Sequence, residues 1–132
     1  LKWTFFAAQA AAKAMTEGGS IINISSRSGS QPNPMTGQYG AAKAGVENLT
    51  ATMAVEWGHR NIRVNAIAPG FFESEMTDTY QPGYLDSQMP RVLLGRTGHG
   101  EELAATAIWL SSAAAGYVTG QTLPVDGGIT VT

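Results

Sequence analysis

The apolar residues of this chain form two kinds of pattern, helical stripes and short continuous runs. Between residues 38 and 58 they recur at steps of four, three, four and four residues, at Ala42, Val46, Leu49, Met53 and Trp57. This spacing places all five side chains on one face of an α-helix. The pattern therefore predicts a long helix over 38–58.

Two other segments have helical spacing. In 1–16 the polar residues fall on one stripe among Ala, Phe and Met, at Lys2, Gln9, Lys13 and Thr16. A stripe that narrow predicts a helix buried on most of its sides. In 101–111 one face carries Leu103, Ala107 and Leu110, and Glu101 and Glu102 stand where acidic side chains favour a helix N-terminus.

Three short apolar runs predict buried strands, at 20–26, 62–68 and 122–125. Pro124 gives the last strand an edge or irregular position, because proline lacks the N–H needed for a second ladder. The stretches 27–36 and 71–95 are rich in Gly and Pro and predict loops. The second stretch is long enough for one or two short helices.

Helices and strands alternate along the chain, which predicts an α/β fold with a parallel sheet and right-handed crossovers. Three strands and about three main helices are expected in the 132 residues, as a single domain. The 43% of hydrophobic residues supports a folded core.

Composition excludes several classes of function. Eight Lys and Arg against ten Asp and Glu leave no basic excess for nucleic acid. No apolar run approaches the ~20 residues of a membrane helix. The absence of Cys excludes disulfides and is typical of the cytoplasm. His59 and His99 stand alone without metal-ligand spacing, so we expect exposed histidines and no metal.

Candidate chemistry gathers where the predicted strands end. Ligands of open parallel sheets bind beyond the carboxyl ends of the strands. There the topology collects Ser26, the Pro69-Gly70 turn, and Tyr39 with Lys43 four residues later on one helix face. A phenol with an ordinary pKa of ~10 is a poor acid or base near neutrality, and a nearby ammonium lowers such a pKa. This set suits protonation of a carbonyl oxygen.

Ser26 followed by Tyr39-Gly40-Ala41-Ala42-Lys43 resembles the Ser … Tyr-x-x-x-Lys motif of the short-chain dehydrogenase/reductase family. Residues 61–70, 119–123 and 125–128 are similar to later segments of the same family. The resemblance covers essentially the whole chain. It implies the C-terminal part of a doubly wound Rossmann fold and hydride transfer between NAD or NADP and a small carbonyl or alcohol substrate.

The resemblance also implies roles for individual residues. Ser26 would polarise the substrate oxygen, Tyr39 would act as the acid or base, and Lys43 would support Tyr39 and hold the nicotinamide ribose. Tyr39 and Lys43 thus belong to both the catalytic and the cofactor-binding set. The rest of the implied cofactor site consists of Pro69, Gly70, the Phe72 backbone, Ser74 in place of the usual Thr, and Met76.

The Gly-rich phosphate loop of the family precedes the matched part, so residues 1–132 correspond to a partial domain on the nicotinamide side. The family's catalytic Asn would stand immediately before Leu1. We therefore expect this chain alone to bind NAD(P)H weakly or not at all. A truncated, non-catalytic fragment or assembly partner remains the alternative to an oxidoreductase.

Substrate and assembly follow from the same resemblance. Within the family, 3-oxoacyl thioesters and sugar-acid or polyol substrates both fit. Residues 73–94 are expected to form a lid and pocket wall with Tyr80, Tyr84 and Met89, and Arg27 is expected either to contact substrate or to reach solvent. The apolar surfaces of the first two helices, including Ala44, Ala51 and Val55, predict a homodimer or homotetramer.

Overall fold

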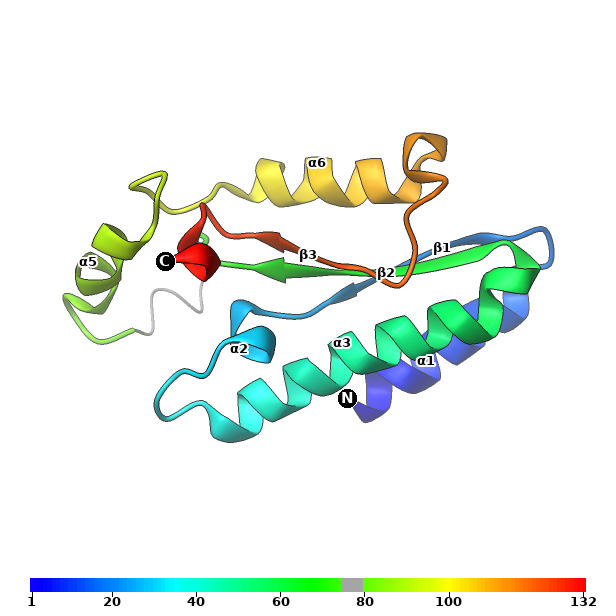
Figure 1. Cartoon of the computed structure of the whole chain (residues 1–132), viewed down its shortest axis with the longest axis horizontal. Coiled ribbons are helices and arrows are strands. Elements are labelled where there is room, and N and C mark those ends of the chain that lie inside the picture. The colour runs from blue at the N-terminus through cyan, green and yellow to red at the C-terminus, as the bar shows by residue number, and fades with distance from the viewer. Residues whose placement is uncertain (75–79) are drawn as a thin grey trace.

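The computed structural model describes residues 1–74 and 80–132. Its centre is a parallel sheet in the order β1-β2-β3. Helices α1 and α3 cover one face of this sheet and α6 covers the other (Figure 1). The predicted α/β fold with a three-stranded parallel sheet is confirmed.

The strands are β1 (Gly19–Ile24), β2 (Ile62–Pro69) and β3 (Thr122–Val125). The middle strand β2 pairs on both sides, with Gly19 opposite Ile62 and Ala66 opposite Thr122. Its residues from Val64 to Ala68 are all buried, as expected for a strand covered on both faces. In the described sheet β3 lies at an edge, where Pro124 is accommodated.

The long helices are α1 (Lys2–Ala14), α3 (Gly37–Trp57) and α6 (Gly100–Ser111), each within two residues of its predicted ends. Short elements complete the described fold: α2 (Arg27–Ser30), α5 (Tyr84–Gln88) and the 3₁₀ turns Gly58–Arg60, Met89–Arg91, Ala113–Ala115 and Ile129–Val131.

One short helix lies in a segment predicted to be loop. Helix α2 occupies Arg27–Ser30, and the Oγ atom of Ser26 accepts a hydrogen bond of 3.2 Å from the Ser28 N–H at its start. Gly29 lets this turn lie against α3, since a Cβ there would be 2.5 Å from the Glu47 Oε1 atom. Packing against α3 is what stabilises a helix too short to form alone.

The apolar core has one part on each face of the sheet. Between the sheet and the α1–α3 layer it includes Ile21, Met53 and Val64, and between the sheet and α6 it includes Ile67 and Leu110. Burial of these side chains supplies the main stabilising free energy of the fold.

Helix α1 is much less buried than predicted. Only Ala8 and Ala12 are fully buried in it, whereas Trp3 is 80% exposed and Phe6 is 49% exposed. The helix meets its neighbours along one stripe of small residues, so its aromatic face points away from them. The predicted burial on most sides is therefore wrong for the single chain.

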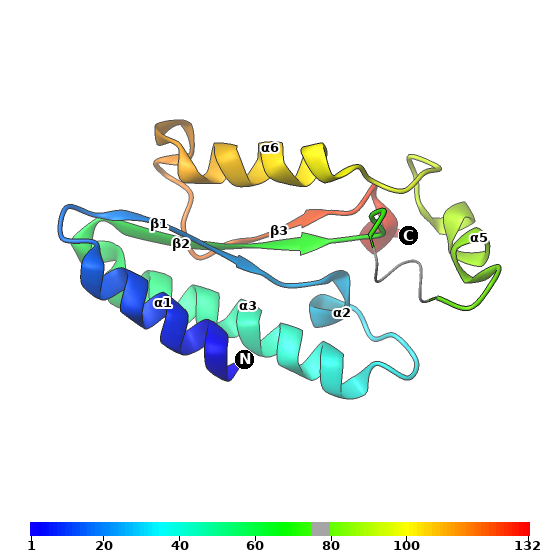
Figure 2. The same cartoon turned by 180° about the vertical axis from the view of Figure 1, so that it is seen from behind.

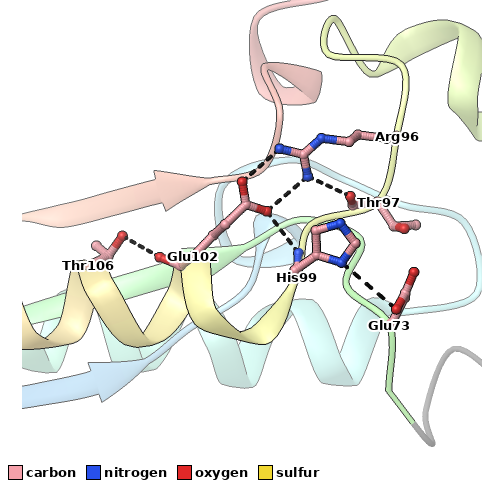
Figure 3. Close-up of polar contacts among 6 residues, drawn as sticks. All are labelled: Glu73, Arg96, Thr97, His99, Glu102 and Thr106. Atoms are coloured by element: carbon pink, nitrogen blue, oxygen red, sulfur yellow. Dashed lines mark hydrogen bonds and ion pairs between the residues drawn. The ribbon is translucent and has the colours of Figure 1, made fainter.

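The N-terminus of α6 carries a polar cluster (Figure 3). The Glu102 carboxylate accepts hydrogen bonds from both terminal nitrogens of Arg96, at 2.7 and 2.9 Å, and one of 2.8 Å from the His99 N–H. These bonds hold the pKa of Glu102 at about 2, with the Arg96 hydrogen bonds as the largest cause. Glu101 and Glu102 lie in the first turn of α6 as predicted, and the structure adds that Glu102 caps the helix by accepting the His99 N–H.

Within 1–74 and 80–132, no helix has the length and apolar character needed to cross a membrane. The same residues contain no group of three His, Cys, Asp or Glu side chains placed to hold a metal ion. His59 and His99 are both exposed, as predicted.

Candidate active site

A cavity of about 640 Å³ opens at the carboxyl ends of β1 and β2. Figure 2 shows α2, the start of α3 and α5 gathered at this end of the sheet. Five of the residues predicted from the sequence line it, namely Ser26, Tyr39, Lys43, Pro69 and Gly70. The tertiary structure therefore brings together segments that are distant in the chain, as the parallel topology predicts.

Tyr39 and Lys43 lie on one face of α3, close to its N-terminus. The Nζ atom of Lys43 donates a hydrogen bond of 2.9 Å to the carbonyl oxygen of Ile24, the last residue of β1. The same Nζ lies 5.7 Å from the centroid of the Tyr39 ring. The lysine is thus held between the strand end and the phenol, with two of its three N–H groups left for other partners.

Ser26 has a structural role as well as a place in the cavity. Its Oγ atom accepts the Ser28 N–H at the start of α2. A hydroxyl that accepts one hydrogen bond still has its own proton to donate. The capping bond therefore fixes the position of Oγ and leaves the O–H able to bind a substrate oxygen.

Ser25, which also lines the cavity, anchors the end of β1 to α3. It is 2% exposed, and its Oγ atom contacts the Lys43 carbonyl oxygen at 3.2 Å and the Glu47 Oε1 atom at 2.7 Å. Both partners lie on α3. Ser25 thus has a structural role, because its contacts join the strand end that precedes Ser26 to the helix that carries Tyr39.

The turn after β2 is shaped by the C-terminal segment. Gly70 donates its N–H to the Val125 carbonyl oxygen at 2.9 Å, and a Cβ at Gly70 would lie 2.6 Å from the Asp126 Cα. The Asp126 carboxylate in turn accepts the N–H groups of Gly128 and Thr130 at 2.9 and 3.0 Å. Only glycine permits this close approach, which sets the cavity wall at Pro69-Gly70.

Of the remaining predicted cofactor residues, Phe72 and Ser74 are not among the described residues that line this cavity. Phe72 pairs with Gly98 in an isolated parallel bridge, and a Cβ at Gly98 would overlap its ring. Phe72 also lines a second, smaller cavity of about 90 Å³. Ser74 is exposed. Met76 lies outside the described residues. The cofactor contacts expected of these three residues stay predictions.

Part of the cavity wall is aromatic. Phe71 packs edge-on against Tyr80 and Tyr84, with ring centroids 6.4 and 6.2 Å away. Both tyrosines line the cavity, so the prediction that 73–94 supplies a pocket wall holds for them. Burial raises the pKa of Tyr80, as do the neighbouring phenols of Tyr84 and Tyr39, and the Arg27 cation acts in the opposite direction.

Sequence reasoning missed part of the lining. Phe71 and residues 33–36 border the cavity but were not predicted to do so. The position of Phe71 directly after the Pro69-Gly70 turn was the available signal. Arg27 is 7% exposed and lies over the Phe71 ring, with its Cζ atom 5.3 Å from the centroid. Of its two expected placements, the one in solvent is wrong.

The chain is similar to known oxidoreductases. The family model described as Enoyl-(Acyl carrier protein) reductase matches residues 1–130. A 3-oxoacyl-[acyl-carrier-protein] reductase FabG of Thermotoga maritima is 45% identical over 113 residues, which are 86% of this chain and 46% of the relative. A gluconate 5-dehydrogenase of Gluconobacter oxydans is 42% identical over 96% of this chain and 51% of the relative.

Solved structures agree in fold. A gluconate 5-dehydrogenase from Burkholderia cenocepacia, in complex with NADP and tartrate, superposes with a TM-score of 0.95 and 39% identity. That match covers all of this chain and 53% of the other. The chain thus spans about half the length of the relatives it matches.

Proposed function

The chain belongs to the short-chain dehydrogenase/reductase family, and on that premise we propose that the full-length protein transfers a hydride between NAD(P)(H) and a carbonyl or alcohol substrate. The observation that carries this proposal is the convergence of Ser26, Tyr39 and Lys43 on one cavity. Each of the three supplies a polar hydrogen at a place where a substrate oxygen can be bound.

Tyr39 is the proposed acid and base. In the direction of reduction its phenolic proton passes to the substrate oxygen, while the Ser26 O–H donates a hydrogen bond to the same oxygen. In oxidation the proton returns to the Tyr39 oxygen. Stabilising charge that develops on the oxygen and moving this proton both lower the barrier.

Lys43 has the donor set that a nicotinamide ribose requires. One of its N–H groups is held by the Ile24 carbonyl oxygen, and the other two can donate to ribose hydroxyls. Lys43 also places a positive charge beside the Tyr39 ring, 5.7 Å from its centroid. NAD or NADP, when bound, supplies or accepts the hydride.

The cofactor contacts carried over from the family are proposals for this chain. Pro69 and Gly70 would lie against the nicotinamide ring, since both line the cavity beside Tyr39. The Phe72 backbone, the Ser74 hydroxyl and Met76 would complete the contacts on the nicotinamide side. The relatives, reductases of 3-oxoacyl groups and a dehydrogenase of gluconate, support a carbonyl or alcohol of small to moderate size.

A homodimer or homotetramer is proposed for the full-length protein. The outer surfaces of α1 and α3 expose Trp3, Phe6, Ala44, Ala51 and Val55. A second subunit that packs the same two helices against them would cover this apolar area, and two-fold symmetric pairs of this kind are the commonest oligomers.

A hydride-transfer assay on the full-length protein tests the proposal. Absorbance of the reduced nicotinamide is followed with both cofactors and a panel of alcohols and ketones. Tyr39→Phe removes one hydroxyl and is expected to lower kcat by at least ~10²-fold. Tyr117→Phe is the matched control, because Tyr117 is fully exposed on the described surface. A wild-type protein without turnover would favour the non-catalytic alternative.

A further inference from the structure

Arg27 is the one arginine of the chain whose charge is buried without an acceptor among the described residues. Arg60 and Arg63 donate to main-chain carbonyl oxygens, the shortest at 2.7 and 2.8 Å, and Arg96 pairs with a carboxylate. Arg91 is exposed. Arg27 is only 7% exposed, and its guanidinium takes part in no ion pair or hydrogen bond with another described group.

The fold nevertheless holds this side chain in a defined place. Arg27 follows Ser26 directly at the first position of α2, and its Cζ atom lies 5.3 Å from the Phe71 ring centroid. Phe71 is itself fixed edge-on by Tyr80 and Tyr84. Such a cation–π contact stabilises a guanidinium that is largely withdrawn from solvent.

Arg27 is one of the residues that line the cavity. Arg27 and Lys43 are the charged side chains among the described lining residues, and no described carboxylate lines the cavity. Lys43 already donates to the Ile24 carbonyl oxygen. A buried cation without an anionic partner is costly. The described lining therefore leaves the Arg27 cation without an anionic partner, at the position next to Ser26 in the chain.

We propose that Arg27 is a specificity-determining residue that binds a carboxylate of the substrate, so that the protein acts on hydroxy acids and oxo acids. The proposal rests on the hydride-transfer function proposed above. The planar fork of a guanidinium matches the two oxygens of a carboxylate. With the carboxylate at Arg27, the reacting carbon lies further along the same molecule, within reach of Ser26 and Tyr39.

The test uses pairs of probes that differ in charge. Oxidation by the full-length protein is measured at constant ionic strength for two pairs of substrates. D-gluconate is compared with D-glucitol, and 3-hydroxybutyrate is compared with its methyl ester. Wild type is expected to prefer the acid in kcat/KM. Arg27→Gln is expected to reduce the acid-to-neutral ratio by about 30-fold or more through KM, and Arg27→Lys to restore part of it.

A matched arginine separates specificity from folding. Arg63→Gln removes a partly buried guanidinium held by Leu110 and Ser112 carbonyl oxygens on the far side of the fold. It is expected to lower the Tm and leave the acid-to-neutral ratio unchanged. Arg27→Met, which keeps the aliphatic stem against Phe71, serves as the second variant if Arg27→Gln does not fold.

The inference would be overturned by a wild type with no preference for the acids, or by a preference that survives in Arg27→Gln and Arg27→Met. A rise in the cofactor KM alone would also overturn it, by assigning Arg27 to the cofactor. If no probe is oxidised, calorimetric titration with tartrate decides. If wild type binds tartrate and Arg27→Gln does not, the inference is supported although the proposed hydride transfer fails. If wild type does not bind tartrate, both the inference and the proposed function are overturned.

Discussion

The Oγ atom of Ser25 donates a hydrogen bond of 2.7 Å to the Oε1 atom of Glu47. Ser25 comes directly after β1, and Glu47 lies in the middle of α3. The bond therefore joins the strand that leads into Ser26 to the helix that carries Tyr39 and Lys43. The relative position of the three proposed catalytic side chains depends on this contact and on the close packing of Gly29 against the same carboxylate.

Replacing Ser25 with Ala is expected to reduce the free energy of unfolding by about 1–3 kcal/mol, because a part-buried carboxylate loses its donor. Urea denaturation of the full-length protein measures the loss. Ser111→Ala is the matched control, since the Ser111 hydroxyl is exposed and bonds only to the Ile108 carbonyl oxygen. Equal midpoints for the two variants would contradict the anchoring role of Ser25.

Lys43→Met should reduce kcat/KM and raise the KM for the cofactor. The change removes the bond to the Ile24 carbonyl oxygen and the cation 5.7 Å from the Tyr39 ring centroid. A loss of at least ~10²-fold is expected for a group that supports general acid–base catalysis. Steady-state kinetics measure both constants. Lys13→Met, on the exposed part of α1, should leave them near wild type.

Gly70→Ala should destabilise the protein by about 1–3 kcal/mol and impair the cavity. The new Cβ would lie 2.6 Å from the Asp126 Cα, so the two backbone segments must separate. Gly100→Ala is the opposite case, because no heavy atom lies within 4 Å of its Cβ position at the start of α6. It should be neutral or stabilising. Thermal unfolding compares the two variants, and similar Tm losses would argue against a required close approach at Gly70.

The Glu102 cluster predicts a pH-dependent stability. The folded pKa of Glu102, about 2, lies below its ordinary value of 4.5. Its contribution is therefore fully present above pH 4.5 and is lost as the pH falls through about 2. Glu102→Gln should unfold at a lower Tm than wild type at neutral pH, with a difference that vanishes near the folded pKa.

Salt and a neighbouring carboxylate provide the controls for this cluster. The Arg96–Glu102 pair is exposed, so added salt should reduce the difference between wild type and Glu102→Gln. Glu101→Gln changes the adjacent exposed carboxylate, which does not bond to Arg96 or His99, and should have a smaller effect. A pH-independent difference would show that the ionised form of Glu102 contributes nothing.

Ala44→Glu should disrupt assembly of the full-length protein. Ala44 is exposed on α3, and a buried unpaired carboxylate at a subunit interface is costly. Sedimentation should show a smaller species than wild type. Ala113→Glu, on an exposed 3₁₀ turn remote from α1 and α3 (Figure 1), should leave the oligomer intact. A wild-type protein that is a stable monomer would contradict the proposed α1–α3 interface.

Much of the architecture could be predicted from residue patterns because it depends on local periodicity. Steps of three and four residues define α3, and short apolar runs between Gly and Pro define the three strands. The alternation of these elements implies a parallel sheet, and this in turn places Ser26, Tyr39 and Pro69-Gly70 at one edge. Spacing and topology therefore located five of the residues that line the main cavity.

Contacts between distant segments required the tertiary structure. Burial of Arg27 depends on the ring of Phe71, and the position of Phe72 depends on Gly98. Much of α1 is exposed because only Ala8 and Ala12 of this helix are fully buried against its neighbours. A periodic pattern reports which side chains are apolar, and it does not report which neighbours are near enough to cover them. In this protein the sequence by itself determined the main helices and strands and the sheet edge that holds the candidate site, and only three-dimensional packing decided that Arg27 is buried at the cavity.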